Sequence, residues 1–130
     1  MDYVKYTDAV LQEVLLMNNR EIGSKAEDRA VRYLMLRLYK IVERNYAART
    51  GEIDIIAKKD NTYVFVEVKY RSDISKGYPA EAVTELKKKK IRRTAEHYLV
   101  SKHINIDNTD IRFDVIEILG RKIKHIKAAF

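Results

Sequence analysis

Two segments rich in Ile, Val, Tyr and Phe, residues 52–58 and 62–70, flank a polar stretch of three residues, Lys59, Asp60 and Asn61. β-Branched and aromatic residues on both sides of a short polar turn are typical of a β-hairpin. If Asp60 and Asn61 form a two-residue loop, the residues on either side of the loop pair directly. The sequence therefore predicts a hairpin, and the length of the loop sets which residues lie opposite one another.

Four charged residues of this hairpin fall on one face. Counting from the loop places Asp54 opposite Glu67, and the same count places Glu52 opposite Lys69. Carboxylates in directly opposed positions destabilise a sheet unless something compensates their charge. Mg²⁺ does so naturally, because it binds one or two carboxylates together with waters and substrate phosphate oxygens. The pattern predicts a site for a hard divalent ion such as Mg²⁺ at Asp54 and Glu67, with Lys69 placed to orient a water or bind a phosphate oxygen.

The prediction of a shared face depends on the register of the hairpin. A three-residue loop would shift the pairing by one and put Asp54 and Glu67 on opposite faces. A solvated hairpin with cross-strand charges is the simpler alternative, because short charge patterns recur by chance. Both faces also carry apolar residues, however, which indicates a sheet covered by helices, where charges are costly without a purpose. The face without the charges is expected to contain Ile53, Ile55, Val64, Val66 and Val68.

Composition and charge limit the class of protein. With 130 residues and 46% hydrophobic content, we expect one globular unit over residues 21–130 and a helical extension over residues 1–20. The net charge of +7 favours an anionic partner, with nucleic acid as the first candidate. The absence of cysteine excludes disulfides and thiolate metal sites. Neither a signal peptide nor a membrane-spanning run is visible, so we expect a cytoplasmic protein with no membrane partner.

The order of the predicted elements favours an α/β fold. Helices are expected over residues 2–17, from 24 to 39 or 40, and 79–101, and strands over residues 41–46, 52–58, 62–70, 111–119 and 121–128. Pro79 suits the first turn of its helix. The order suits a mixed central sheet flanked by helices. The helix at residues 2–17 has a wide apolar surface, which must be covered by the core or by a partner chain.

Two residues outside the hairpin are candidates for the same site. Ser24 and Glu27 have the spacing of a capping box, in which Glu27 bonds back to the start of the helix. Glu27 also lies on the helix stripe expected to face the sheet, where it can serve as a third acid, and the two roles are compatible. Lys87 recurs with Val83 and Ile91 at intervals of four, which points its side chain inward toward the hairpin acids.

Residues 87–93 contain six cations in seven positions. Such a run is either a solvated helix face or, in a basic protein, a phosphate-binding surface. The candidates for nucleic-acid contacts are Arg49, Arg71, Lys76, Lys87, Lys88, Arg92 and Arg93. Asp114 lies in an otherwise apolar strand, where a structural pair with an arginine or a capping role is favoured over catalysis. The three histidines, His97, His103 and His125, have no metal-ligand spacing and are assigned no chemistry.

Several short motifs occur together between residues 23 and 117. They are Gly23-x-x-Ala26-Glu27, Arg44-Asn45-Tyr46, Gly51-Glu52-Ile53-Asp54, Phe65-Val66-Glu67-Val68-Lys69-x-Arg71, Gly77-x-Pro79-x-Glu81-Ala82-Val83 and Arg112-Phe113-Asp114-Val115. This set resembles the YraN-like family of small bacterial predicted endonucleases. That family is similar to archaeal Holliday junction resolvases and belongs to the PD-(D/E)XK nuclease superfamily. Ile53 replaces the proline of the superfamily's name and leaves the acid in place.

The resemblance implies a restriction-endonuclease-like α-β-β-β-α-β core with an extra N-terminal helix. It implies Glu27, Asp54 and Glu67 around an Mg²⁺ or Mn²⁺ ion, with Lys69 beside the attacking water. The substrate expected from it is DNA, including branched or junction DNA, and a homodimer would suit a two-fold substrate. Two alternatives remain: a nucleic-acid binding module of the same fold with little or no catalysis, and a scaffold that docks a protein partner through its N-terminal helix.

Overall fold

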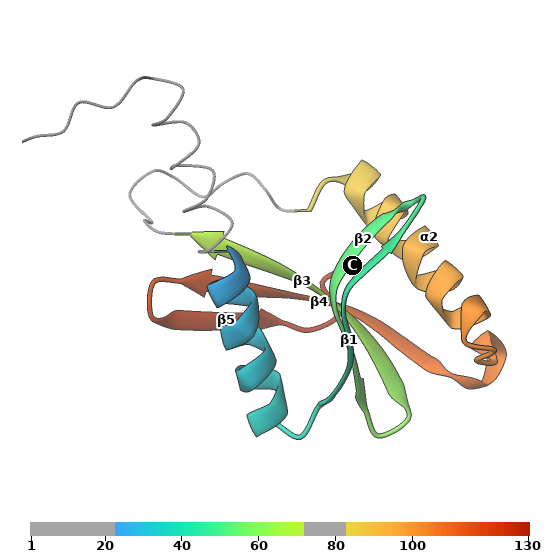
Figure 1. The fold of residues 1–130 in the computed structure, drawn as a ribbon, viewed down its shortest axis with the longest axis horizontal. Coiled ribbons are helices and arrows are strands. Elements are labelled where there is room, and N and C mark those ends of the chain that lie inside the picture. Colours follow the sequence, from blue (N-terminus) through green and yellow to red (C-terminus); the bar gives the residue numbers. More distant parts are fainter. Residues whose placement is uncertain (1–22, 72–82) are drawn as a thin grey trace, which may run out of the picture.

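A five-stranded sheet lies at the centre of the computed structural model, which describes residues 23–71 and 83–130 (Figure 1). The strands follow the order β1-β2-β3-β4-β5 across the sheet. The described elements are a helix over residues 23–36, β1 (Lys40–Ala48), β2 (Gly51–Lys59), β3 (Thr62–Arg71), α2 (Glu85–Ser101), the 3₁₀ helix η2 (Ile106–Asn108), β4 (Asp110–Leu119) and β5 (Lys122–Ile126). This is the expected α-β-β-β-α-β core with β5 added at the edge.

The sheet is mixed, as predicted. Strands β1, β2 and β3 pair in antiparallel fashion, and so do β4 and β5. Between these two groups, β3 and β4 are parallel over their whole length. Parallel neighbours need a crossover connection, and α2 lies in the chain between these two strands. The sequence order of helices and strands therefore determines the α/β class.

The predicted two-residue hairpin loop is confirmed. Lys59 pairs with Thr62, and Asp60 adopts a positive φ of 53°, a conformation that Asp and Asn tolerate better than most residues. The β2–β3 ladder then runs to the pair of Ile55 and Val66. Beyond that pair β2 continues to pair with β1 only. The predicted pairs nearer the end of the hairpin are therefore not part of the ladder.

Helices cover both faces of the sheet, which agrees with the apolar character of both faces of the hairpin (Figure 1). The helix over residues 23–36 covers the first face through a buried cluster formed by Ala26, Ala30, Leu34, Tyr39, Ile55, Ala57, Val64, Val66, Ile116 and Ile118. On the opposite face α2 packs on a second cluster that consists of Ile53, Ile56, Phe65, Val83, Ile91, Ala95, Tyr98, Leu99 and Val115. The core is thus split into two layers by the sheet.

Ile53 corrects one detail of the predicted faces. We expected its side chain beside Ile55, but it belongs to the cluster under α2 and is 1% exposed. The β1–β2 ribbon twists out of the plane of the other strands toward α2 (Figure 1). Two-stranded ribbons twist more strongly than wide sheets, so strict alternation of faces fails where β2 has lost its pairing with β3.

Both described helices differ from their predicted limits. The first ends at residue 36, because Leu38 turns into the left-handed region with a φ of 69° and Tyr39 donates its N–H to the Leu34 carbonyl. Within the described residues α2 begins at Glu85, with Thr84 as its N-cap, and not at Pro79 as predicted. Lys76, Pro79 and the predicted helix at residues 2–17 lie outside the described residues. Neither described helix is long and apolar enough to cross a membrane.

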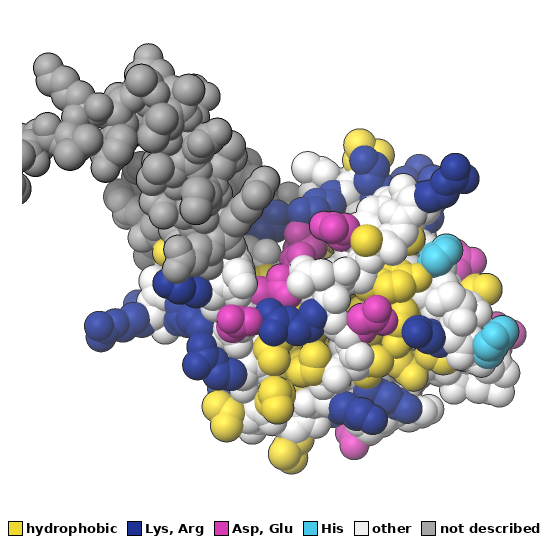
Figure 2. Space-filling view, viewed as in Figure 1, with side chains coloured by type: hydrophobic (Ala, Val, Ile, Leu, Met, Phe, Trp, Pro, Cys, Tyr) yellow, Lys and Arg dark blue, Asp and Glu magenta, His cyan; other side chains and the backbone are white. Residues whose placement is uncertain are grey.

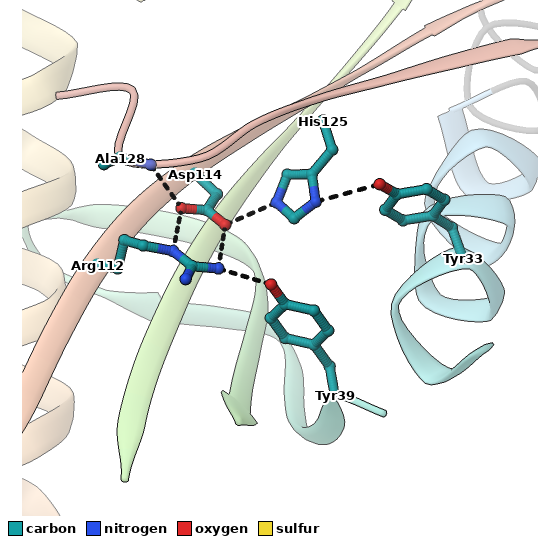
Figure 3. Close-up of polar contacts among 6 residues, drawn as sticks. All are labelled: Tyr33, Tyr39, Arg112, Asp114, His125 and Ala128. Carbon is teal, nitrogen blue, oxygen red and sulfur yellow. Dashed lines mark hydrogen bonds and ion pairs between the residues drawn. The ribbon is translucent and has the colours of Figure 1, made fainter. Parts of the chain in front are cut away.

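Asp114 forms a buried polar centre on β4, and the predicted arginine partner is Arg112 (Figure 3). The guanidinium donates to both carboxylate oxygens, at 2.8 Å from Nε and 2.9 Å from Nη2. His125 Nε2 lies 2.7 Å from Oδ2, and the Ala128 N–H donates to Oδ1 at 3.0 Å. Burial alone would raise the pKa of Asp114, but these partners, led by Arg112, outweigh it and hold the pKa below its ordinary value.

Two tyrosines connect this polar centre to the first helix and the turn after it. The Tyr39 hydroxyl accepts a hydrogen bond from Arg112 at 2.7 Å, and the Tyr33 hydroxyl lies 3.3 Å from Nδ1 of His125 (Figure 3). The network therefore ties the helix over residues 23–36 to β4 and β5. We assign this network a structural role. The His125 side chain is buried within it, a position that the spacing of the histidines in the sequence did not indicate.

Candidate active site

A cleft of about 570 Å³ lies where the start of β2, the middle of β3 and the first turns of α2 meet. Its walls are formed by Gly51, Glu52, Asp54, Glu67, Thr84, Leu86, Lys87, Lys90 and Ile91. Figure 2 shows acidic side chains gathered in the region between the two helices, with Lys and Arg side chains on both sides of them. The cleft thus combines acids from the hairpin with bases from α2.

Asp54 and Glu67 come together in this cleft, as the hairpin count predicted. Both side chains line the cleft, close enough for the charge of Glu67 to act on Asp54, although they lie just beyond the last ladder pair. Asp54 Oδ2 also accepts the N–H of Val68 at 2.8 Å, so this side chain ties β2 to β3 where the ladder has ended. Glu67 is 8% exposed. Two acids in contact, largely shielded from water, are the defining feature of the site.

The surroundings of Asp54 raise its pKa to about 7. Burial is the largest cause, and the negative charge of Glu67 is the second. The Val68 N–H opposes both, and Glu27 adds a smaller repulsion. Near pH 7 Asp54 is therefore about half protonated, and loss of its proton leaves two adjacent negative charges that favour a cation.

Two lysines face the acid pair. Lys87 Nζ lies 2.6 Å from Glu67 Oε1, which confirms the inward direction predicted from its helix spacing. Lys69 lies close enough to Lys87 for the two positive charges to repel each other. Burial, followed by the charge of Lys87, lowers the pKa of Lys69. Burial is the largest single influence on Lys87 and works against its charge, but the hydrogen bond to Glu67 and the negative charges of Glu67 and Asp54 together outweigh burial and raise its pKa. Lys69 is therefore the amine that more readily becomes neutral.

Glu27 lies beside this group and is held by β1. Its Oε1 accepts Nε of Arg44 at 3.2 Å and Nδ2 of Asn45 at 3.0 Å. Ser24 is itself helical, so it does not cap this helix, and the capping-box interpretation of Glu27 is wrong. The Glu27 side chain is 13% exposed and lies close enough to Asp54 to contribute to its raised pKa.

The carboxylates of Asp54 and Glu67 are suitable ligands for a hard divalent ion. Asp54 and Glu67 offer carboxylate oxygens in the cleft, and Mg²⁺ commonly uses one or two carboxylates with waters and substrate phosphate. Within residues 23–71 and 83–130 no three acids or histidines gather closely enough to hold an ion together. Glu27 is therefore placed at the side of the acid pair, with its carboxylate bound to β1, and not within a three-acid cluster.

The predicted phosphate-contact residues do not form one cluster. Among those described, Lys87 is the member that lines the cleft. Lys88 and Arg92 lie over the ring of Phe130, at 5.9 and 5.4 Å from its centroid, on another side of α2. The others are Arg49, exposed in the turn after β1, Arg71 at the end of β3, Arg93, exposed on α2, and Lys76, outside the described residues.

Thr84 and Lys90 also line the cleft and were not selected from the sequence. Thr84 Oγ1 accepts the N–H of Lys87 at 3.2 Å, which caps α2 and points the positive end of the helix dipole into the cleft. A threonine three residues before Lys87 is the sequence signal for this cap. The sequence prediction instead started the helix at Pro79, which is also a signal for a helix start. Lys90 follows Lys87 by three residues, a spacing that places both on one side of a helix.

Comparison with known proteins gives the family. Residues 26–118 match the profile of the uncharacterised protein family UPF0102. The chain is 50% identical to a UPF0102 protein of Clostridioides difficile (strain 630) over 116 residues, which cover 88% of this chain and 100% of that relative. It is 44% identical to one of Lachnoclostridium phytofermentans over 114 residues, which cover 88% and 96% of the two chains. The names of these relatives state no activity. The chain therefore belongs to the UPF0102 family, the YraN-like family that its motifs resemble.

Proposed function

We propose that this protein is an endonuclease that hydrolyses phosphodiester bonds in DNA with the help of Mg²⁺ or Mn²⁺. The observation that carries the proposal is the contact between Asp54 and Glu67 in a cleft that also contains Lys87. Acids held together against their mutual repulsion, beside bases and a helix N-terminus, suit the binding of a cation and a phosphate. The resemblance of the motifs to PD-(D/E)XK nucleases supports the same activity.

The residues of the cleft, together with Lys69 beside the acid pair, divide the work of hydrolysis. Asp54 and Glu67 would hold the ion through their carboxylate oxygens. When bound, the ion polarises the phosphate and lowers the pKa of a water. Lys69, whose pKa is already lowered, hydrogen bonds to that water through Nζ and accepts its proton. Lys87 and the N-terminal turn of α2 stabilise the negative charge that develops on the phosphate.

The charge of the protein supports DNA as the partner. The net charge is +7, and exposed cations on α2 extend the basic surface away from the cleft. Such cations hold the phosphate backbone without reading its sequence. Branched or junction DNA is proposed as the preferred form because of the resemblance to junction resolvases.

A DNA-binding module without catalysis is the second candidate, and one observation favours it. Lys87 already neutralises Glu67, and the raised pKa of Asp54 keeps that group about half protonated near pH 7. The cluster is thus satisfied in the absence of an ion. Under this alternative the same surface grips DNA through its cations, and the acids only shape the cleft.

The test is an incubation of the protein with linear, nicked and four-way DNA in Mg²⁺, in Mn²⁺ and in EDTA. A matched pair of variants accompanies it: Glu67→Gln removes a cleft carboxylate, and Glu96→Gln makes the same change on the exposed side of α2. We expect ion-dependent cutting that Glu67→Gln lowers by at least about a hundredfold, because even residues that only orient metal ligands cost about ten- to a hundredfold. Glu96→Gln should cut like the wild type.

Two outcomes would contradict the proposal in different ways. If the wild type binds DNA but cuts none of the three forms with either ion, the binding module replaces the nuclease. If Glu67→Gln or Asp54→Ala cuts as fast as the wild type, the cutting does not come from this cleft. Retained DNA binding by both variants shows that loss of cutting is not loss of fold.

A further inference from the structure

The ammonium group of Lys87 lies on the acid pair and not in open solvent. Its Nζ is 2.6 Å from Glu67 Oε1, and its positive charge lies near that of Lys69. Glu67 is an acid that the proposed function assigns to the divalent ion. The lysine therefore occupies, in this structure, a place on the carboxylate that an incoming ion would compete for.

A lysine and a divalent ion cannot share this carboxylate without cost. Both are cations, and the repulsion between charges a few ångströms apart is strong where water is partly excluded. Either cation can neutralise the carboxylate of Glu67. Because Glu67 is only 8% exposed, leaving its negative charge unpaired would be costly. Entry of the ion therefore favours release of Lys87 from Glu67.

The cleft provides a second position for the released side chain. Lys87 is on the first turn of α2 and its side chain is 43% exposed on the cleft side, so its four-carbon stem can swing without movement of the helix. Lys90 and the Thr84-capped N-terminus of α2 line the same cleft. A phosphate group held there would meet two ammonium groups and the positive end of the helix dipole.

We propose that Lys87 is an exchangeable internal counter-ion. It neutralises Glu67 while the divalent ion is absent, leaves Glu67 when the ion enters, and then binds a phosphate group of the DNA in the cleft. This inference rests on the proposed function, because it assigns the ion to Asp54 and Glu67. Its consequence is regulatory: ion binding creates a phosphate site, so ion and DNA each raise the affinity for the other.

The experiment measures ion affinity in the absence of DNA. Mn²⁺ and Mg²⁺ are titrated into the full chain by calorimetry for the wild type, Lys87→Met, Lys87→Arg and Lys89→Met. Lys89 is exposed on the same helix, so its variant makes the same change in net charge outside the cleft. We expect Lys87→Met to bind the ions about tenfold more tightly than Lys89→Met, because the competing charge has gone. Lys87→Arg keeps the charge and should bind no more tightly than the wild type.

The outcomes separate this inference from the proposed hydrolysis. A folded Lys87→Met protein that binds the ions no more tightly than Lys89→Met would overturn it, even if the wild type cuts DNA. If Lys87→Met does not fold, Lys87→Arg decides, and a gain in ion affinity there overturns it. The expected order of affinities without any cutting would support the counter-ion and reject the nuclease. Wild-type protein that binds neither ion would reject both.

Discussion

The carboxyl groups of Asp54 and Glu67 lie in one cleft, one step beyond the point where the β2–β3 ladder ends at Ile55 and Val66. The strands are therefore held together here by side chains, with Asp54 bound to the Val68 N–H. Two carboxylates that repel each other therefore lie where backbone hydrogen bonds between β2 and β3 no longer hold the strands together. The folded protein carries a cost at this point, and protonation or a bound cation lowers it.

Stability without an ion should depend on the charge of Asp54. Its pKa is about 7 in the folded protein against an ordinary value of 3.8, so folding takes up a proton between these values. Stability is therefore highest below about pH 4 for this group and is lost as pH rises through 7. We expect Asp54→Asn to be more stable than the wild type at pH 8 by roughly 4 kcal/mol, with no difference at pH 4. Urea denaturation in EDTA measures this.

The control for that experiment is Asp60→Asn in the exposed hairpin loop. This change removes the same charge from the same hairpin, but far from Glu67, so its effect on the free energy of unfolding should not vary between pH 4 and 8. Equal pH profiles for Asp54→Asn and the wild type would show that Asp54 is not strained by its neighbour.

Ion binding should show the opposite dependence on pH. An ion that uses both carboxylates requires the proton on Asp54 to leave, and the pKa of this group is about 7. We expect the affinity for Mn²⁺ to fall by about tenfold for each pH unit below 7, with about one proton released per ion at pH 6. Calorimetry in two buffers with different heats of protonation counts that proton. Affinity that stays constant from pH 5 to 8 would place the ion elsewhere.

The sequence predicts the parts of the site that local rules control. Asp60 and Asn61 favour a tight turn, and a tight turn fixes the register that brings Asp54 to Glu67. The inward direction of Lys87 follows from helical spacing alone. Both features depend on residues close together in the chain, where the geometry of one element is sufficient.

The rest depends on packing between distant segments. Glu27 is bound by Arg44 and Asn45, which belong to another element, and no local pattern connects the three. Ile53 changes faces because the β1–β2 ribbon twists, an effect of how the strands end. Thr84 was missed as the cap of α2 because it and Pro79 are both signals for a helix start.

The polar centre around Asp114 should control stability and not activity. Asp114 is fully buried and accepts hydrogen bonds from Arg112 and Ala128, with His125 also in contact. Asp114→Asn leaves the Arg112 charge without its partner, and we expect a loss of about 3 kcal/mol in the free energy of unfolding. Because the folded pKa is lowered, the stabilisation is present above an ordinary pKa of 3.8 and is lost as pH falls below it.

Chemical denaturation at pH 7 measures this loss, with Asp110→Asn as the control. Asp110 begins the same strand but is exposed, so its variant should lie within about 0.5 kcal/mol of the wild type. A loss for Asp114→Asn that is no greater than for Asp110→Asn would mean that the network does not hold β4 and β5 to the first helix.

The conformation of Gly51 should matter for the shape of the cleft. Its φ is +144°, a region that residues with a Cβ rarely adopt, and an added Cβ would lie 3.6 Å from Thr94 Oγ1 and 3.9 Å from Lys90 Cβ. Because those contacts are ordinary, the cost of Gly51→Ala comes from the backbone, and we expect a loss of about 1–3 kcal/mol in stability. The start of β2 must then shift, and with it the wall of the cleft and Asp54.

The comparison variant is Gly120→Ala, at a φ of +55° with open space around the added Cβ and outside the cleft. It should lose about 1 kcal/mol, the ordinary cost of a left-handed conformation for a residue with a Cβ. Denaturation gives both stabilities, and ion affinity by calorimetry gives the state of the acid pair. We expect Gly51→Ala to weaken ion binding and Gly120→Ala to leave it unchanged. If the two variants bind the ion equally well, the conformation at Gly51 is not what places Asp54 beside Glu67.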